Sequence, residues 1–315
     1  MSNTPLSGLL VVDKPRGPTS HDVVGRMRRI LGTRSVGHAG TLDPMATGVL
    51  VVMVGACTKL SRFLTLEDKK YRATVRLGES TDTLDAEGTI TETAPIPPPI
   101  RASLATVEGG DIDVVAPSLL ADVLAIERGR TSQVPPSHSA IKQNGVASYK
   151  KARRGEVVAL PPRDIRVLDL AVVGATLEPA ELHVMLHVSK GYYVRSFARD
   201  VGQGLGVPSH LSSLRRVQSG PWGLDGAVTM ESEADEVRSA IISLEDVART
   251  CLPTCELTAD GARRALYGQR LADEDFSEAP GEAPTAWFDP DGRLIAVGDR
   301  SRGWPTVLRA FLHAG

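Results

Sequence analysis

The sequence predicts an α+β fold, in which one large domain carries a mixed, largely antiparallel sheet and a small second domain follows it. A length of 315 residues suits this division, and 42% hydrophobic residues suffice for a packed core. Strand-like runs and segments with helical spacing both occur along the first part of the chain, and the pattern changes near residues 249–256. We therefore expect domains at residues 1–250 and 251–315.

The N-terminal third supplies the first elements of this fold. Residues 8–12 form a short apolar run, which is typical of a buried strand. Residues 19–22, TSHD, resemble a helix capping box, and the apolar side chains after them recur at helical spacing. Residues 48–55 form another apolar strand, and residues 71–77 alternate between apolar and polar side chains. This alternation places Tyr71 on the inward-facing side of its strand.

The middle of the chain predicts a helix at residues 118–128 and a polar loop that opens at the proline pair 135–136 and leads to a helix at 149–154. Strand candidates at 163–173 and 182–190 come next. They lead directly into a helical pattern that begins near Arg195. A strand-to-helix junction is a position from which a long side chain can reach a cleft.

The glycine-rich residues 202–206, GQGLG, end this helical pattern and do not follow a strand, so they are interpreted as a helix end and not as a dinucleotide-binding fingerprint. In the C-terminal part, residues 258–267 predict a short helix, and DPDG at 289–292 predicts a hairpin turn. Charged side chains between residues 272 and 291 are all acidic, so this surface is not expected to contact phosphates.

The overall charge does not suggest a nucleic-acid-binding protein, but its distribution does. The formal net charge is 36 − 38 = −2, whereas phosphate binding normally uses a basic surface. Residues 14–34 hold six basic side chains against Asp22 alone, and residues 142–154 hold five with no acid. Each stretch could bind phosphates or could form a solvated helix face.

Neither membrane insertion nor a disulfide framework is expected. The apolar run at residues 49–54 is far shorter than the roughly 18 residues that a membrane-spanning helix needs, and we expect a cytoplasmic protein. The chain has three cysteines, an odd number that does not fit a framework of disulfide pairs. Cys251 and Cys255 supply only two ligands, so a zinc site is not expected.

The most informative segment is residues 37–48, GHAGTLDPMATG, which sets Asp43 on a turn bounded by glycines and close to His38. Glycines allow backbone shapes and close approaches that suit a loop lying against a ligand. Asp-Pro is also an ordinary helix start, with Asp43 as the N-cap and Pro44 as the first helical residue. Both interpretations remain open at the level of this segment alone.

Further motifs favour a catalytic interpretation. Together with this loop, residues 69–73 (KKYRA), 78–88 (GESTDTLDAEG) and 189–196 (SKGYYVRS) resemble the bacterial tRNA pseudouridine-55 synthases of the TruB family. The resemblance extends over roughly residues 8–220 through three more segments, VDKP at 12–15, PPSHSAIK at 135–142 and LRR at 214–216. It implies the pseudouridine synthase fold with a C-terminal PUA-like domain. It also implies conversion of uridine 55 in the T-arm of tRNA to pseudouridine by a monomer, with no cofactor and no metal.

The resemblance implies three catalytic residues, Asp43, Tyr71 and Arg195. The Asp43 carboxylate would attack C1′ of the flipped nucleotide or remove its 2′ proton, and the sequence does not choose between these routes. Arg195 would keep this carboxylate ionised and oriented through a bidentate contact. Tyr71 would stack on the uracil, and its hydroxyl would serve proton transfer at C5.

The resemblance also implies a substrate-binding set. His38 would occupy the space that the flipped base leaves, and Leu214 would pack on the base. A segment at about residues 131–156 would form a thumb that grips the RNA. Contacts with the tRNA, most of them to phosphates, are expected from Lys14, Tyr193, Lys142, Arg153 and Arg154.

Two other functions are alternatives to this one. A noncatalytic RNA-binding or tRNA-folding protein of the same fold would not need Asp43, Tyr71 and Arg195 together. A carboxylate-dependent hydrolase of a nucleoside or glycoside would need a second acid near Asp43, for which Asp82 and Asp85 are the motif candidates.

Overall fold

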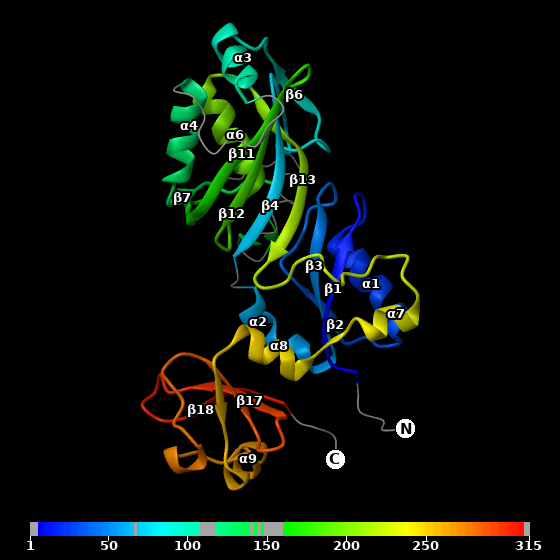
Figure 1. The fold of residues 1–315 in the computed structure, drawn as a ribbon, viewed down its shortest axis with the longest axis vertical. Coiled ribbons are helices and arrows are strands. Elements are labelled where there is room, and N and C mark those ends of the chain that lie inside the picture. The colour runs from blue at the N-terminus through cyan, green and yellow to red at the C-terminus, as the bar shows by residue number, and fades with distance from the viewer. Residues whose placement is uncertain are drawn as a thin grey trace.

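The computed structural model describes residues 6–65, 68–107, 118–138, 142–143, 146–147 and 160–311. Figure 1 shows a large sheet with helices along one side of it and a separate small sheet near the C-terminus. The chain is therefore α+β, as expected from the sequence. No helix in the described ranges is long and apolar enough to cross a membrane.

The large sheet has eight strands and is mixed but largely antiparallel. Its strand order is β11 (Val167–Leu177), β12 (Ala180–Val188), β4 (Lys69–Leu77), β13 (Ser209–Ser219), β3 (Thr47–Val54), β1 (Gly8–Lys14) and β14 (Ile242–Ser243), with β2 (Val36–Ala39) paired to β3. Among the described strands of this sheet, β13 and β3 form the parallel pair, and the other pairs are antiparallel. The predicted strands at 8–12, 48–55 and 71–77 are confirmed, and those at 163–173 and 182–190 correspond to β11 and β12 with shifted ends.

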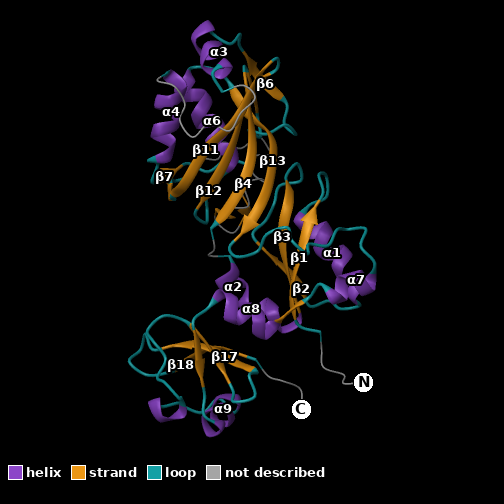
Figure 2. Cartoon of the chain, viewed as in Figure 1, coloured by secondary structure: helices purple, strands orange, loops and turns teal. Residues whose placement is uncertain are grey.

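Three helices cover one face of this sheet, namely α3 (Pro98–Ala105), α4 (Leu119–Arg128) and α6 (Val194–Leu205). Figure 2 shows them on one side of β11 and β12. The inward-facing side chains of β4 alternate with outward polar ones, and the buried set includes Tyr71, Ala73 and Val75. The N-terminal end of α6, which carries Arg195, also packs on this core face. Tyr71 and Arg195 therefore belong to elements that meet on the same side of the sheet.

The helix ends follow the expected chemistry. Helix α1 (Ser20–Leu31) begins with the predicted capping box, in which the Thr19 hydroxyl accepts the Asp22 N–H and the Asp22 carboxylate accepts the Thr19 N–H. Helix α6 ends at a left-handed Gly206, which confirms the prediction of a glycine-rich helix end. α7 (Ala234–Ser239) packs against α1.

Small paired strands and short helices complete the large domain. The strand pairs are β5 (Glu79–Thr81) with β6 (Ile90–Thr93), β7 (Ser132–Gln133) with β10 (Arg163–Asp164), and β8 (Lys142–Gln143) with β9 (Val146–Ala147). The short helical segments are η1 (Gly55–Leu60), α2 (Ser61–Leu64) and α8 (Leu244–Cys251). The predicted helix at 149–154 lies outside the described residues.

The C-terminal sheet consists of β15 (Thr254–Glu256), β16 (Thr285–Phe288), β17 (Leu294–Asp299) and β18 (Thr306–Ala310), with α9 (Ala259–Leu266) and η2 (Asp273–Asp275) beside it. The predicted turn at 289–292 joins β16 to β17. In Figure 1, α2 and α8 lie between the two sheets. One apolar cluster joins Leu244 and Val247 of α8 to Phe288 and Leu294, and the Arg249 guanidinium stacks 4.1 Å from the Phe288 ring centre.

Candidate active site

Asp43 lies in the loop of residues 40–46 that joins β2 to β3, which we call the Asp43 loop. The Ala46 N–H donates to the Asp43 carbonyl, so this part of the loop is a tight turn, and no helix begins at Pro44. The helix-start interpretation of Asp-Pro is therefore wrong here. Leu42 and Met45 on either side of the turn are buried in the core, which anchors the loop while the Asp43 side chain stays 35% exposed.

Arg195 is the second residue of α6, and its guanidinium meets the Asp43 carboxylate with two nitrogens. Nε lies 2.9 Å from Oδ2, and Nη2 donates to Oδ1 at 3.2 Å. The Arg195 side chain is 7% exposed. The remaining donors are also used, since Nη1 donates to the Thr83 carbonyl at 3.1 Å and Nη2 to the His138 carbonyl at 2.9 Å. The guanidinium is therefore fixed by groups from three separate segments of the chain.

A second carboxylate, Asp85, lies on the other side of the same guanidinium. Its Oδ2 is 3.6 Å from Arg195 Nη1, and its Oδ1 accepts the Thr83 hydroxyl at 2.6 Å and the Glu87 N–H at 3.1 Å. The Asp85 side chain is buried. A hydrolase would need this residue as a free second acid, but its oxygens are already engaged. Asp85 instead adds a second negative charge that holds Arg195 in place.

The protonation of Asp43 reflects opposing influences. Burial raises the pKa of the Asp43 carboxyl and is the largest cause of the shift. The Arg195 charge lowers this pKa, Asp85 raises it, and Lys14 lowers it. The carboxylate is thus partly desolvated, and its guanidinium partner favours the ionised form.

Tyr71 and Leu214 come from neighbouring strands of the large sheet, β4 and β13, and face the same core. Leu214 of β13 pairs with Ala73 of β4, and Tyr71 lies two residues before Ala73 on the same strand. Both side chains are buried and belong to the apolar cluster that contains Leu42 and Met45 of the Asp43 loop. The structure therefore places the tyrosine, the leucine and the base of the Asp43 loop in one cluster.

Comparison with known proteins decides the family to which this constellation belongs. Residues 28–194 match the family described as "TruB family pseudouridylate synthase (N terminal domain)". The chain belongs to the TruB family. It is 43% identical over 314 residues to "tRNA pseudouridine synthase B" of Arthrobacter sp. (strain FB24), a match that covers 97% of each chain. It is 41% identical to the protein of the same name from Thermobifida fusca (strain YX), over 94% of this chain and 95% of that one.

Solved structures support the fold of this TruB family member. A chain in the crystal structure of a Cbf5–Nop10–Gar1 complex superposes with a TM-score of 0.67, at 23% identity, over 97% of this chain and 85% of that chain. A chain in the structure of an H/ACA RNP bound to a substrate RNA containing 2′-deoxyuridine gives a TM-score of 0.65 over the same share of each chain, at 22% identity. These likenesses concern the fold alone.

His38, which the family resemblance assigns to the RNA, lies on β2 at the start of the same segment. Its ring meets the exposed His21 ring edge to face, with centroids 5.4 Å apart. The buried Nδ1 atom has no hydrogen-bond partner among the described residues. Burial is the largest cause that lowers the pKa of His38, and the charges of His21 and Arg216 lower it further. The lowered pKa favours a neutral imidazole, and the His38 residue as a whole is partly exposed.

The predicted phosphate contact of Lys14 does not fit its position. The Lys14 side chain is fully buried, and its ammonium donates to the carbonyls of Pro15, Pro18 and Pro44 at 2.7 to 3.1 Å. Burial lowers its pKa to about 8. All three donors are committed to backbone oxygens, so Lys14 supports the turn next to Asp43 and is not available at the surface.

The structure describes only part of the remaining residues that are predicted to contact tRNA. Tyr193 is the N-cap residue of α6, where its ring is partly exposed. The Lys142 backbone lies in β8, whereas its side chain and all of Arg153 and Arg154 lie outside the described residues. No group of three or more His, Cys, Asp or Glu side chains in the described ranges is placed to hold a metal ion.

Sequence reasoning missed Gln133, a buried residue of β7. Its side chain accepts the Tyr193 N–H at 2.9 Å and donates to the Tyr193 carbonyl at 3.2 Å, and so fixes the start of the helix that carries Arg195. The Ser196 hydroxyl also donates to the Val134 carbonyl. A lone glutamine in a polar segment gives no signal of this role, because the role exists only through the packing of β7 on α6.

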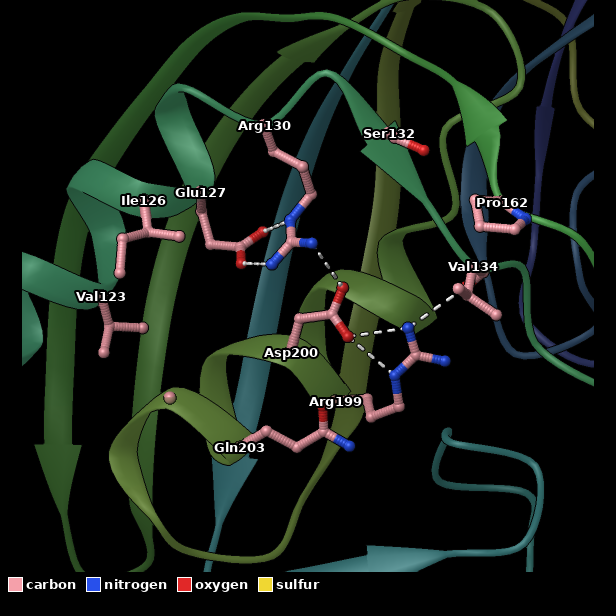
Figure 3. Close-up of a pocket in the computed structure, with 11 residues that line it drawn as sticks. Val123, Ile126, Glu127, Arg130, Ser132, Val134, Pro162, Arg199, Asp200 and Gln203 are labelled. Atoms are coloured by element: carbon pink, nitrogen blue, oxygen red, sulfur yellow. Dashed lines mark hydrogen bonds and ion pairs between the residues drawn. The ribbon is translucent and has the colours of Figure 1, made fainter.

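A second arginine–carboxylate network lies one helical turn further along α6. The Arg199 guanidinium meets Asp200 at 2.7 Å, and Arg130 pairs with Glu127 of α4 and lies 3.8 Å from Asp200. Figure 3 shows these four residues, which we call the α4–α6 network, around a cavity of about 710 Å³. The rest of the cavity is lined by apolar residues such as Val123, Ile126 and Val134 and by the polar Ser132 and Gln203.

Proposed function

We propose that this chain converts a uridine of tRNA to pseudouridine, and that the target is uridine 55 in the T-arm. The observation that carries the proposal is the bidentate contact between the buried Arg195 guanidinium and the partly exposed Asp43 carboxylate, whose neighbours Leu42 and Met45 lie in the cluster that holds Tyr71. The tRNA substrate is the one that the names of the TruB relatives state. The position within tRNA follows the family resemblance of the sequence motifs.

The reaction rearranges the nucleotide without adding or removing atoms. The N1–C1′ bond breaks, the uracil turns while it stays bound, and a C5–C1′ bond forms. The C5 proton then leaves and N1 gains a proton. The Asp43 carboxylate serves either as the nucleophile at C1′ or as the base at the 2′ position. The flipped uracil would gain stacking on Tyr71 and Leu214, which offsets the few kcal/mol of unstacking.

The domain boundaries at 250/251, a monomeric state and a cytoplasmic location form part of the same proposal. The C-terminal sheet packs on the large domain through the cluster around Phe288, so it would act as a fixed support. Its acidic segment at residues 272–291 would face away from the tRNA phosphates. Arg153 and Arg154, in the thumb segment, would contact them instead.

The experiment is tritium release from tRNA transcripts that carry 5-tritiated uridine, with mapping of the modified position. Release at uridine 55 by the wild-type protein, and its loss in Asp43→Asn with tRNA binding retained, is the expected result. Tight tRNA binding without release would make the chain a noncatalytic RNA-binding protein. Free uracil among the products would make it a hydrolase.

A further inference from the structure

Arg216, on β13, lies beneath the Asp43 loop as a buried cation. Its side chain is 1% exposed, and none of the carboxylates in the described part of the chain lies within ion-pair distance of it. Its hydrogen bonds go to backbone carbonyls instead, from Nε to Val49 at 2.6 Å and from Nη2 to Gly40 at 2.9 Å. Burying a guanidinium without a counter-charge is costly, so the position needs a compensating role.

The two carbonyls that Arg216 binds flank the Asp43 loop, since Gly40 begins the loop and Val49 is the third residue of β3 after it. Gly40, where the loop begins, has a φ of +78°, and a Cβ there would lie 3.4 Å from Arg216 Nη1. Gly48, the second residue of β3 after the loop, has a φ of +96°, and a Cβ there would lie 2.1 Å from the Arg216 carbonyl oxygen. Both glycines therefore combine a left-handed backbone with close approach to the same residue.

The backbone of Arg216 also connects the loop to the rest of the site. It pairs with Gly48 of β3 on one side and with Tyr71 of β4 on the other. Side chain and main chain of one residue thus set the Asp43 loop against the strand that presents Tyr71. Leu214, two residues earlier on β13, faces the same cluster.

We propose that Arg216 is a positioning residue, which holds Asp43 in line with Arg195 by binding the carbonyl oxygen of Gly40 at the start of the Asp43 loop and that of Val49 on β3 just after the loop. The proposal rests on the proposed function, because its effect is read as the rate of pseudouridine formation. Arg216 touches no reacting atom. Its loss would let the ends of the loop separate, and a displacement of about 1 Å at a reacting group is enough to cost about 100-fold in rate.

The test compares Arg216→Met, which keeps an unbranched stem but removes the donors, with Arg215→Met as the matched control. Arg215 is the neighbouring residue on β13, is 37% exposed, and pairs with Asp13 instead of the loop carbonyls. Single-turnover pseudouridine formation and tRNA affinity are measured separately. We expect Arg216→Met to lose about 100-fold in rate and Arg215→Met about twofold or less, with tRNA affinity nearly unchanged in both.

The pH profile separates positioning from a general loss of structure. If the loop leaves Arg195, the Asp43 pKa rises, so the acid side of the rate profile of Arg216→Met moves to higher pH. Arg216→Lys keeps the charge and can still reach one carbonyl, so we expect an intermediate rate. If Arg216→Met does not fold, a slowed but tRNA-binding Arg216→Lys supports the proposal, and a wild-type rate in this variant overturns it.

Two results would overturn the proposal while leaving the proposed function intact. One is an Arg216→Met protein that reacts as fast as Arg215→Met. The other is an Arg216→Met protein whose tRNA affinity falls as far as its rate. A wild-type protein that forms no pseudouridine in the same assay would instead refute the proposed function itself.

Discussion

Helix α6 carries two arginine–carboxylate networks, one at Arg195 and one a turn later at Arg199, and they differ in what their carboxylates can still do. In the α4–α6 network the carboxylates of Glu127 and Asp200 are both buried, and both form ion pairs with arginines. At the other network Asp85 is equally buried, but Asp43 stays partly exposed on a turn between two strands. Only the Arg195 network leaves an oriented carboxylate open to a ligand.

This difference shows that a charge network or a cavity does not by itself locate the chemistry. The cavity of about 710 Å³ lies beside the closed network, where every described carboxylate is already paired. At the Asp43 carboxylate, burial raises the pKa and one guanidinium opposes this rise, which is the kind of perturbed environment found at functional sites.

The largest effect is expected from Asp43→Asn. The amide keeps the shape of the carboxylate but cannot act as a nucleophile or base, so turnover should fall by at least about 100-fold while tRNA affinity stays within a few fold. Single-turnover assays with radiolabelled tRNA measure the first quantity and filter binding measures the second. A variant that retains more than about 1% of the wild-type rate would contradict the assignment.

Tyr71→Phe comes next, with Tyr192→Phe as its control. Tyr192 is also buried, and its hydroxyl has no hydrogen-bond partner among the described residues. We expect Tyr71→Phe to slow product formation by about 100-fold, in the range for a lost proton-transfer group, with stacking on the uracil retained. Tyr192→Phe should keep the wild-type rate. Equal rates for the two variants would remove the proton-transfer role from Tyr71.

A smaller effect concerns pH. Because burial raises the pKa of Asp43 above the ordinary aspartate range, kcat/KM should begin to fall on acidification at a pH above that range. Ionised Asp43 is the active form, so activity is present above its folded-state pKa and is lost below it. Arg195→Lys weakens the interaction that lowers this pKa and should move the acid limb to still higher pH. An unchanged acid limb would show that another group controls it.

The smallest effect on rate is expected at the closed network. Glu127→Gln leaves Arg130 with only part of its counter-charge and should reduce the free energy of unfolding by about 1 to 3 kcal/mol. Burial raises the pKa of Glu127, so its ionised form already carries a desolvation cost and the loss should lie toward the low end. Thermal unfolding measures the stability. A rate defect in the folded variant would give this network a catalytic role.

Local sequence patterns predicted much of this molecule, and the features they did not predict share one physical origin. The capping box at Thr19, the inward position of Tyr71 and the junction that carries Arg195 each depend on neighbours along the chain. The burial of Lys14 and Arg216 depends on backbone carbonyls that converge only after folding. A lysine or arginine in a sequence is ordinarily exposed, so no local pattern distinguishes these two from phosphate-binding residues.

The most direct test of the central claim is the single-turnover rate of Arg195→Lys beside Arg199→Lys, two identical changes one turn apart on α6. Lysine keeps the charge but loses the planar fork that holds Asp43. We predict a loss of roughly 30- to 1,000-fold for Arg195→Lys, corresponding to about 2 to 4 kcal/mol, with unchanged tRNA affinity. Arg199→Lys should stay within about twofold of the wild-type rate. Equal rates for the two variants, or an Arg195→Lys protein that binds tRNA weakly but reacts normally once bound, would contradict the claim that Arg195 holds the reacting carboxylate.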